Sequence, residues 1–197
     1  MEKITKYQLF TLLAFSLIFL AFYFGIENYN LDRENYYHPM LSFENSIPKI
    51  SFFVIFYLLA YPLGILPFIL IKEKELLKKT LKAYLIIITI STIIYLIFPT
   101  EIIKPDLNLN NFFDRIIFSF RIISPHNILP SLHASLMLLS TLICNIKYKK
   151  LGKFLYIFTI FVGLSTLFTK QHYILDVITS FLLAFIAFKL VFKKTYK

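Results

Sequence analysis

The sequence is poor in cysteine, glycine and charged residues. It has one cysteine, Cys144, so no disulfide can form within its 197 residues. Glycine occurs 4 times, and only 16% of the residues are charged. No Cys/His zinc spacing, glycine-rich nucleotide loop or internal repeat is visible. These shortages exclude a disulfide scaffold, a zinc module and a nucleotide-binding motif.

The residues that take the place of charge are apolar. Hydrophobic residues make up 58% of the chain, and its mean hydropathy is +0.71. This is far too apolar for a soluble domain of this length. Apolar runs long enough to cross a bilayer recur along the chain. The sequence therefore predicts an all-α integral membrane protein.

Six membrane spans are predicted, each bounded by charged segments or segments that contain Pro or Asn. Together they predict a six-helix bundle that forms a single domain over residues 1–197. The spans cover residues 7–26, 50–71, 81–98, 130–146, 151–169 and 173–192.

The distribution of charge predicts an orientation. Basic residues outnumber acidic ones by 21 to 11, and most of them lie on one side of the predicted spans, in residues 3–6, 72–82, 147–153 and 189–197. By the positive-inside rule, both termini are expected to be cytoplasmic. The basic face suits anionic lipid headgroups. We therefore expect no nucleic-acid partner, and no obligatory protein partner is evident.

Two short segments combine histidine with a carboxylate and a lysine. Residues 130–133 read Pro-Ser-Leu-His, and residues 169–176 read Thr-Lys-Gln-His-Tyr-Ile-Leu-Asp. His172 and Asp176 are four residues apart, so on a helix they would share a face, and the carboxylate would orient the imidazole. His133 lies at the start of the fourth span. In the predicted orientation, all three side chains lie at the outer side.

These residue types suit phosphate chemistry. The start of the fourth span offers backbone N–H groups and the Ser131 hydroxyl to an anion, and Lys170 adds a positive charge. His172, oriented by Asp176, would attack phosphorus, and His133 would protonate the leaving oxygen. Such a site needs no metal and no organic cofactor.

At these residues the chain resembles the type 2 phosphatidic acid phosphatase superfamily, which also contains the vanadium haloperoxidases. Within it, the chain looks most like the branch of inositol phosphorylceramide synthase. The resemblance covers roughly residues 50–190 and implies a six-helix membrane bundle with its site on the outer side. It rests on Pro130-Ser131-Leu132-His133, on Ser165 with His172 and Asp176, more loosely on Lys104-Pro105, and for the branch on Asn127 and Lys170-Gln171-His172-Tyr173.

The chain departs from the family signature where cations are usual. Ile97 stands in place of a lysine in the first motif, and Thr166 stands in place of an arginine in the third. The apolar positions of residues 111–121 suit a helix in the membrane interface, which would bring two arginines to the outer side. The candidates for phosphate contact are Ser131, Lys104, Lys170, Arg115 and Arg121.

Three functions remain open. The first is a lipid phosphatase, in which water attacks a phospho-His172 intermediate. The second is a phosphotransferase, in which a lipid or sugar hydroxyl takes the phosphoryl or phosphohead group. The third is a non-enzymatic or haem-binding membrane protein, with His133 and His172 as axial ligands. Asp176 and Lys170 have no role in the third.

We interpret the chain as a lipid phosphatase or related phosphotransferase whose partner is a lipid phosphate in the membrane. Phosphatidic acid, phosphatidylglycerol phosphate, polyprenyl diphosphate and phosphorylated lipid A are the candidate substrates. The composition, rich in lysine and isoleucine, suggests a bacterial inner membrane, with the site facing the periplasm or exterior.

Overall fold

The structure is a computed structural model that describes residues 4–103, 106–123 and 126–193, with the backbone alone for residues 120–123. This part of the chain contains helices and isolated β-bridges but no β-strand. The prediction of an all-α membrane fold is therefore confirmed. The helices are α1 (Lys6–Leu31), α2 (Val54–Gly64), α3 (Leu66–Leu70), α4 (Lys74–Ile97), α5 (Phe112–Ile123), α6 (Leu132–Lys147), α7 (Lys149–Phe168) and α8 (Ile174–Phe192).

Each predicted span coincides with a helical segment. Five segments of the described chain are long and apolar enough to cross a membrane: α1, α4, α7, α8 and the segment Ser51–Leu70, which contains α2 and α3. The helix α6 is apolar but shorter, at 16 residues. The second span is broken at Ile65, between α2 and α3. Pro67 lies in the first turn of α3, where its missing N–H leaves no helical bond unmade.

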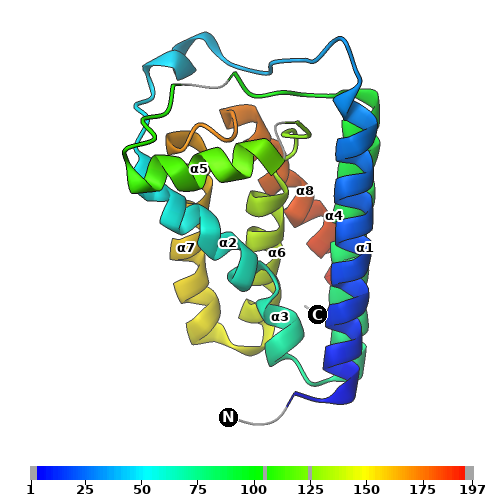
Figure 1. Cartoon of the computed structure of the whole chain (residues 1–197). Helices are drawn as coiled ribbons and strands as arrows, with labels where there is room; N and C mark the ends of the chain where they lie inside the picture. The colour runs from blue at the N-terminus through cyan, green and yellow to red at the C-terminus, as the bar shows by residue number, and fades with distance from the viewer. Residues whose placement is uncertain (1–3, 104–105, 124–125, 194–197) are drawn as a thin grey trace.

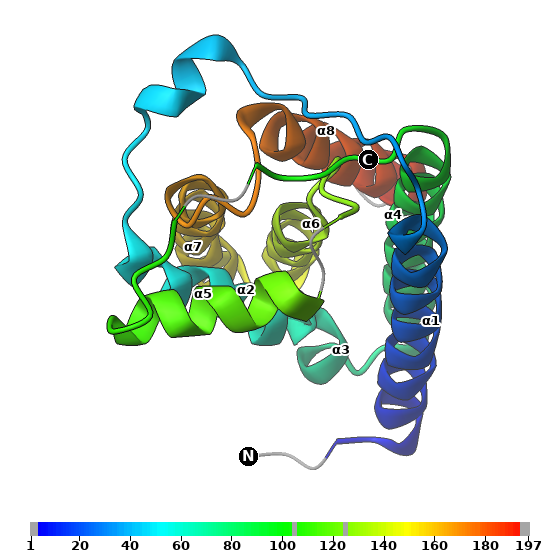
Figure 2. The ribbon, with the colours of Figure 1, turned by 45° about the horizontal axis from the view of Figure 1, so that its top comes forward.

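The helices α1, α4, α6 and α7 run in about the same direction, and α2 and α8 are inclined to them (Figures 1 and 2). The helix α1 packs beside α4 on one flank, and α6 packs against α2, α7 and α8 on the other. The central helix α6 buries small and polar residues, among them Ala134, Ser135, Ser140 and Thr141. Small side chains let neighbouring backbones approach closely inside a membrane bundle. The side chains of α6 therefore suit its place between three neighbouring helices.

The helix α5 lies across one end of the bundle, which we call the α5 end (Figure 1). Its Asp114 side chain is buried and accepts hydrogen bonds from Lys49 Nζ and Asn108 N, both at 2.8 Å, and from the Ser51 hydroxyl. Burial raises the pKa of Asp114, but these bonds outweigh it and hold the pKa below its ordinary value. The helix is therefore fastened to the segment that enters α2.

The predicted site segments meet at the α5 end. The start of α6, the end of α7 and the start of α8 lie there, whereas the start of α1 and the turn between α6 and α7 lie at the opposite end (Figure 1). Both histidine segments are thus brought to the same end of the molecule. The single-domain organisation and the cytoplasmic placement of both termini stay predictions.

Candidate active site

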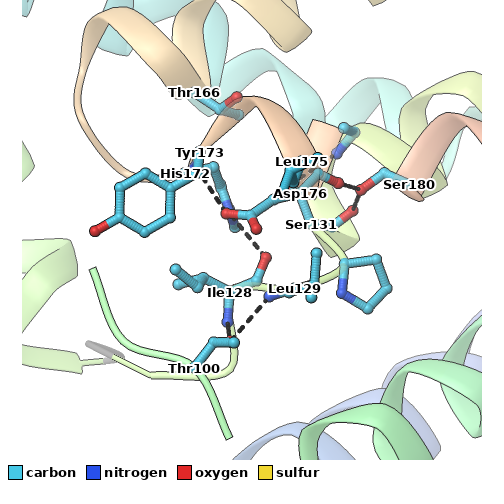
Figure 3. A network of polar contacts seen from close by, with 12 residues as sticks. Thr100, Ile128, Leu129, Ser131, Thr166, His172, Tyr173, Leu175, Asp176 and Ser180 are labelled. Carbon is cyan, nitrogen blue, oxygen red and sulfur yellow. Dashed lines mark hydrogen bonds and ion pairs between the residues drawn. The ribbon is translucent and has the colours of Figure 1, made fainter. Parts of the chain in front are cut away.

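His172 lies in the turn between α7 and α8 (Figure 3). Its Nδ1 atom is 2.9 Å from the Ile128 carbonyl oxygen and 3.3 Å from Asp176 Oδ2. Both groups are acceptors, so the hydrogen is held on Nδ1 and the lone pair is left on Nε2. A backbone bond of 3.1 Å from His172 N to the Thr166 carbonyl holds the turn.

The pairing of His172 with Asp176 does not come from a shared helical face. The helix α8 begins at Ile174, so His172 precedes it. Asp176 lies in the first turn of α8, and its Oδ2 also accepts a bond of 2.8 Å from Tyr173 N. The carboxylate therefore caps the helix start and reaches back to the histidine. A negative group is also favoured at this end of a helix dipole.

Asp176 is completely buried. Its second oxygen, Oδ1, has no hydrogen-bond partner among the described residues. A buried carboxylate that is only partly satisfied costs free energy, which an interaction with a proton on His172 offsets. This arrangement is typical of a histidine whose basicity is set by its carboxylate.

The start of α6 is bonded directly to α8. Ser131 N donates to the Asp176 carbonyl at 3.3 Å, and the Ser180 hydroxyl donates to the Ser131 carbonyl at 2.9 Å (Figure 3). The Ser131 hydroxyl accepts from Ala134 N at 3.4 Å as the N-cap of α6. The helix begins at Leu132, later than the expected start at Pro130. The Ser131 N–H is thus taken by Asp176, and the phosphate contact expected of its hydroxyl stays a prediction.

His133 lies in the first turn of α6, with its ring centroid 6.1 Å from that of His172. The Tyr57 hydroxyl lies 3.3 Å from His133 Nδ1, and the edge of the Tyr61 ring meets the imidazole at 4.9 Å between centroids. Sequence analysis did not single out these tyrosines. Their only signal is a spacing of four residues in an apolar run. The contact with Tyr57 leaves Nε2 as the ring nitrogen of His133 available for proton transfer.

Two cavities meet at His172. The larger has a volume of about 270 Å³, and its polar lining includes Glu44, Asn45, Lys170 and His172, between walls of Met40, Ile47, Ile102, Ile103 and Leu167. The smaller, of about 30 Å³, lies between His126, His133 and His172 and is otherwise lined by residues that include Tyr23, Tyr57 and Tyr95. The larger cavity can hold a phosphate group with part of an apolar substituent. The smaller holds about one water molecule.

Lys170 is the predicted phosphate ligand that the structure brings to the larger cavity. Its backbone is left-handed, with φ 54°, and its Nζ donates to the Glu44 carbonyl at 3.0 Å. Burial lowers the pKa of Lys170, and the Glu44 carboxylate opposes this shift. Glu44 itself accepts a bond of 3.0 Å from Ile174 N through Oε2, at the start of α8.

Of the other predicted cations, the structure describes the side chain of Arg115 alone. Arg115 is exposed on α5 and does not line either cavity. Lys104 and the side chain of Arg121 lie outside the described residues. Thr166, which stands in place of a family arginine, donates from its hydroxyl to the Gly163 carbonyl at 2.8 Å. Ile97, which stands in place of a family lysine, is exposed.

A family model described as the PAP2 superfamily matches residues 67–197 of the chain. The chain belongs to the PAP2 superfamily. Membership implies phosphatase or phosphotransferase chemistry on phosphate esters. No significant match was found among curated proteins or among solved structures.

The PAP2 match contains the three predicted catalytic residues, but it begins after α2. The helices α1 and α2, and the segment between them, lie before the matched region. Tyr57 and Glu44 therefore reach the site from outside the part that matches the family. Among the described residues, no group of three or more His, Cys, Asp or Glu side chains is arranged to hold a metal ion.

Replacing Lys170 with glutamine is expected to weaken inhibition by inorganic phosphate or vanadate. Glutamine keeps a hydrogen-bond donor for the Glu44 carbonyl but removes the charge that faces the larger cavity. A charge-assisted hydrogen bond contributes about 1.5–3 kcal/mol, so the inhibition constant should rise roughly ten- to hundredfold. Inhibition is measured with a soluble phosphate ester as substrate.

The matched control for Lys170 is Lys78→Gln, because Lys78 is exposed on α4 and pairs with Glu75. That variant should keep the wild-type inhibition constant. An unchanged constant for Lys170→Gln would assign the phosphate contact to other cations.

Proposed function

We propose that the chain is a membrane phosphatase that hydrolyses a lipid-linked phosphate monoester or diphosphate through a phospho-His172 intermediate. The observation that carries the proposal is the double fixation of His172 Nδ1 by Asp176 and the Ile128 carbonyl. It leaves Nε2 as the nucleophilic atom of a histidine that lines both cavities.

The first half-reaction transfers the phosphoryl group to the protein. His172 Nε2 attacks phosphorus while the bond from phosphorus to the leaving oxygen breaks, and His133 gives that oxygen a proton. Asp176 stabilises the imidazolium character that develops on His172. Lys170 stabilises the negative charge on the phosphoryl oxygens, which supplies most of the catalysis in such transfers.

The second half-reaction restores the histidine. His133, now neutral, takes a proton from a water molecule that attacks phosphorus, and the bond between nitrogen and phosphorus breaks. Inorganic phosphate leaves. The same His133 nitrogen acts as acid and then as base, as microscopic reversibility requires.

A phosphotransferase is the second candidate. In that reaction an alcohol replaces water in the second half-reaction, and the product is a new phosphate ester. The volume and mixed lining of the larger cavity suit a polar group attached to an apolar chain, which describes a lipid acceptor as well as a lipid phosphate. The likeness of residues 127 and 170–173 to inositol phosphorylceramide synthase supports the same candidate.

The haem-binding alternative fits the site poorly. The cavity that His133 shares with His172 has about 30 Å³, and the His133 ring is packed against Tyr57 and Tyr61. A porphyrin held between the two histidines would need several hundred Å³. The positions of His172 and His133 are better suited to phosphoryl transfer and proton transfer, respectively.

The proposed setting is a bacterial inner membrane, with the α5 end facing the periplasm or exterior. The gathering of lysines at the opposite end supports this orientation. The substrate would be a lipid phosphate that reaches the cavity from the outer leaflet. Phosphatidic acid, phosphatidylglycerol phosphate, polyprenyl diphosphate and phosphorylated lipid A remain candidates.

The decisive experiment measures phosphate release by the detergent-purified protein from these four lipids, in excess EDTA, with and without an alcohol-bearing lipid. We expect release without the added lipid. A phosphorylated product that forms only with the added lipid would establish the transferase instead. If neither product forms with any substrate, the proposal is wrong.

A further inference from the structure

The C-terminal end of α1 buries polar side chains that the proposed reaction does not use. Of its 26 residues, only Gln8, Thr11, Phe15, Glu27 and Asn30 are buried. The Glu27 side chain is close to fully desolvated, since 3% of the residue is exposed, and Asn30 is not exposed at all. Burying a carboxylate near the end of a membrane helix is costly. Such a residue calls for a compensating set of partners.

Those partners lie in the segment that leads to α6. Glu27 Oε2 accepts from Asn127 Nδ2 at 2.8 Å, and Glu27 Oε1 lies 3.1 Å from His126 Nδ1. Asn30 Nδ2 donates to Asn127 Oδ1 at 2.5 Å and to the Tyr95 carbonyl at 3.1 Å. Both polar atoms of the Asn127 side chain are therefore held by α1.

Asn127 adopts a left-handed backbone conformation, with φ 60°. Asparagine tolerates this region better than other residues with a Cβ atom, and its side-chain bonds determine whether it stays there. The chain direction at Asn127 in turn sets the carbonyl of the next residue, Ile128. That carbonyl accepts the hydrogen bond from His172 Nδ1.

A third contact fixes the same segment from α4's side. Asn127 N donates to the Thr100 carbonyl at 3.0 Å, and the Thr100 hydroxyl accepts from Ile128 N at 3.1 Å (Figure 3). The Thr100 bonds hold the Ile128 amide from one side. The α1 side chains hold Asn127 from the other side. Together these bonds fix the orientation of the Ile128 carbonyl, which faces His172 Nδ1.

We propose that Glu27 and Asn30 are positioning residues for His172, which act through Asn127 and the Ile128 carbonyl. The inference rests on the proposed role of His172 as nucleophile. It gives α1 a second task besides membrane anchoring, because α1 lies outside the region that matches the family and still fastens the catalytic segment. Neither residue touches the reacting atoms.

The test compares four variants: Glu27→Gln, Asn30→Ala, Asn127→Ala and the double variant Asn30→Ala/Asn127→Ala. We expect kcat to fall about ten- to hundredfold for Asn127→Ala, with KM changed less than about threefold, because small displacements of a reacting group are costly. Glu27→Gln and Asn30→Ala should lower kcat in the same way but less. The double variant should be no slower than Asn127→Ala, since Asn30 acts through Asn127.

The matched control is Gln8→Ala. Gln8 is also a buried amide of α1, and its Nε2 donates to the Ile69 carbonyl at 2.7 Å, at the opposite end of the helix. Its loss loosens α1 without touching the catalytic segment, so kcat should stay at the wild-type value. If Gln8→Ala lost as much kcat as the Glu27 and Asn30 variants, the losses would reflect general destabilisation of α1, and the proposal would be wrong.

A readout that needs no turnover separates this inference from the proposed function. The ¹⁵N spectrum of histidine-labelled protein reports which ring nitrogen of His172 carries the hydrogen, and the spectrum of His172→Ala assigns the signal. Wild type should show hydrogen on Nδ1. Because Asp176 also holds this hydrogen, Asn127→Ala is compared on the Asp176→Asn background, where it should raise the share of the other tautomer. An equal share of tautomers in Asp176→Asn and in Asp176→Asn/Asn127→Ala would overturn the inference. Absence of phosphate release by wild type would instead overturn the proposed function.

Discussion

Replacing His172 with alanine is expected to abolish phosphate release. Alanine leaves no nitrogen atom to accept the phosphoryl group. His133 is not expected to replace it, because contacts with Tyr57 and Tyr61 hold the His133 ring in its own position. Loss of a covalent nucleophile lowers kcat on the order of 10⁴-fold or more. The fold should survive, because the backbone bond from residue 172 to the Thr166 carbonyl does not involve the side chain.

Release of phosphate and the thermal unfolding midpoint are measured on the same preparations. His38→Ala is the matched control, since His38 is an exposed histidine whose Nδ1 lies 2.8 Å from the Glu101 carbonyl. It should retain wild-type turnover. Turnover of His172→Ala within about tenfold of wild type would rule out a phospho-His172 intermediate.

Replacing Asp176 with asparagine is expected to lower kcat by about 10²- to 10⁴-fold with little change in KM. In a triad of serine, histidine and aspartate, the same change costs about 10⁴-fold, because the amide favours the wrong tautomer. Here the Ile128 carbonyl, 2.9 Å from His172 Nδ1, also favours the correct tautomer. The loss should therefore fall below that of the triad.

The matched control for Asp176 is Asp106→Asn, because Asp106 is an exposed acid at the α5 end, and it is its backbone carbonyl that accepts the hydrogen bond from Lys49 Nζ. That variant should keep its kcat. A wild-type kcat for Asp176→Asn would show that the buried pair serves only the start of α8. Combining Asp176→Asn with Asn127→Ala should remove both restraints on the ring and give the slowest variant short of His172→Ala.

The sequence was enough to find the two segments of the candidate site, but it did not give the geometry of the contact between His172 and Asp176. The residues 130–133 and 169–176 carry polar groups that stand out against apolar spans, so they were recognisable without a structure. The helical face assumed for His172 and Asp176 was wrong, because α8 begins only at Ile174. The carboxylate reaches the histidine by capping the helix start. Spacing alone cannot separate these two geometries, since both place residues four apart in contact.

Apart from Asp176, the groups that hold the two candidate catalytic histidines carry no sequence signal. The Ile128 carbonyl belongs to the backbone, and any residue could provide it. Tyr57 lies in an apolar span that holds other tyrosines, and nothing in its spacing connects it to His133, 76 positions later. Glu27 and Asn127 are separated by 100 positions. Such contacts depend on how α1, α2 and α6 pack, which the order of residues does not state.

The sequence by itself determined that this protein is an all-α membrane bundle of the PAP2 superfamily, and it predicted that two histidine segments meet at one end. The lengths of the apolar runs and the distribution of charge depend on many residues, so no single residue decides them. Only the tertiary structure decided which groups hold His172, which cation reaches the cavity, and that α1 is fastened to the catalytic segment. Those outcomes depend on differences of about 1 Å between packed helices, and packing of the whole chain sets them.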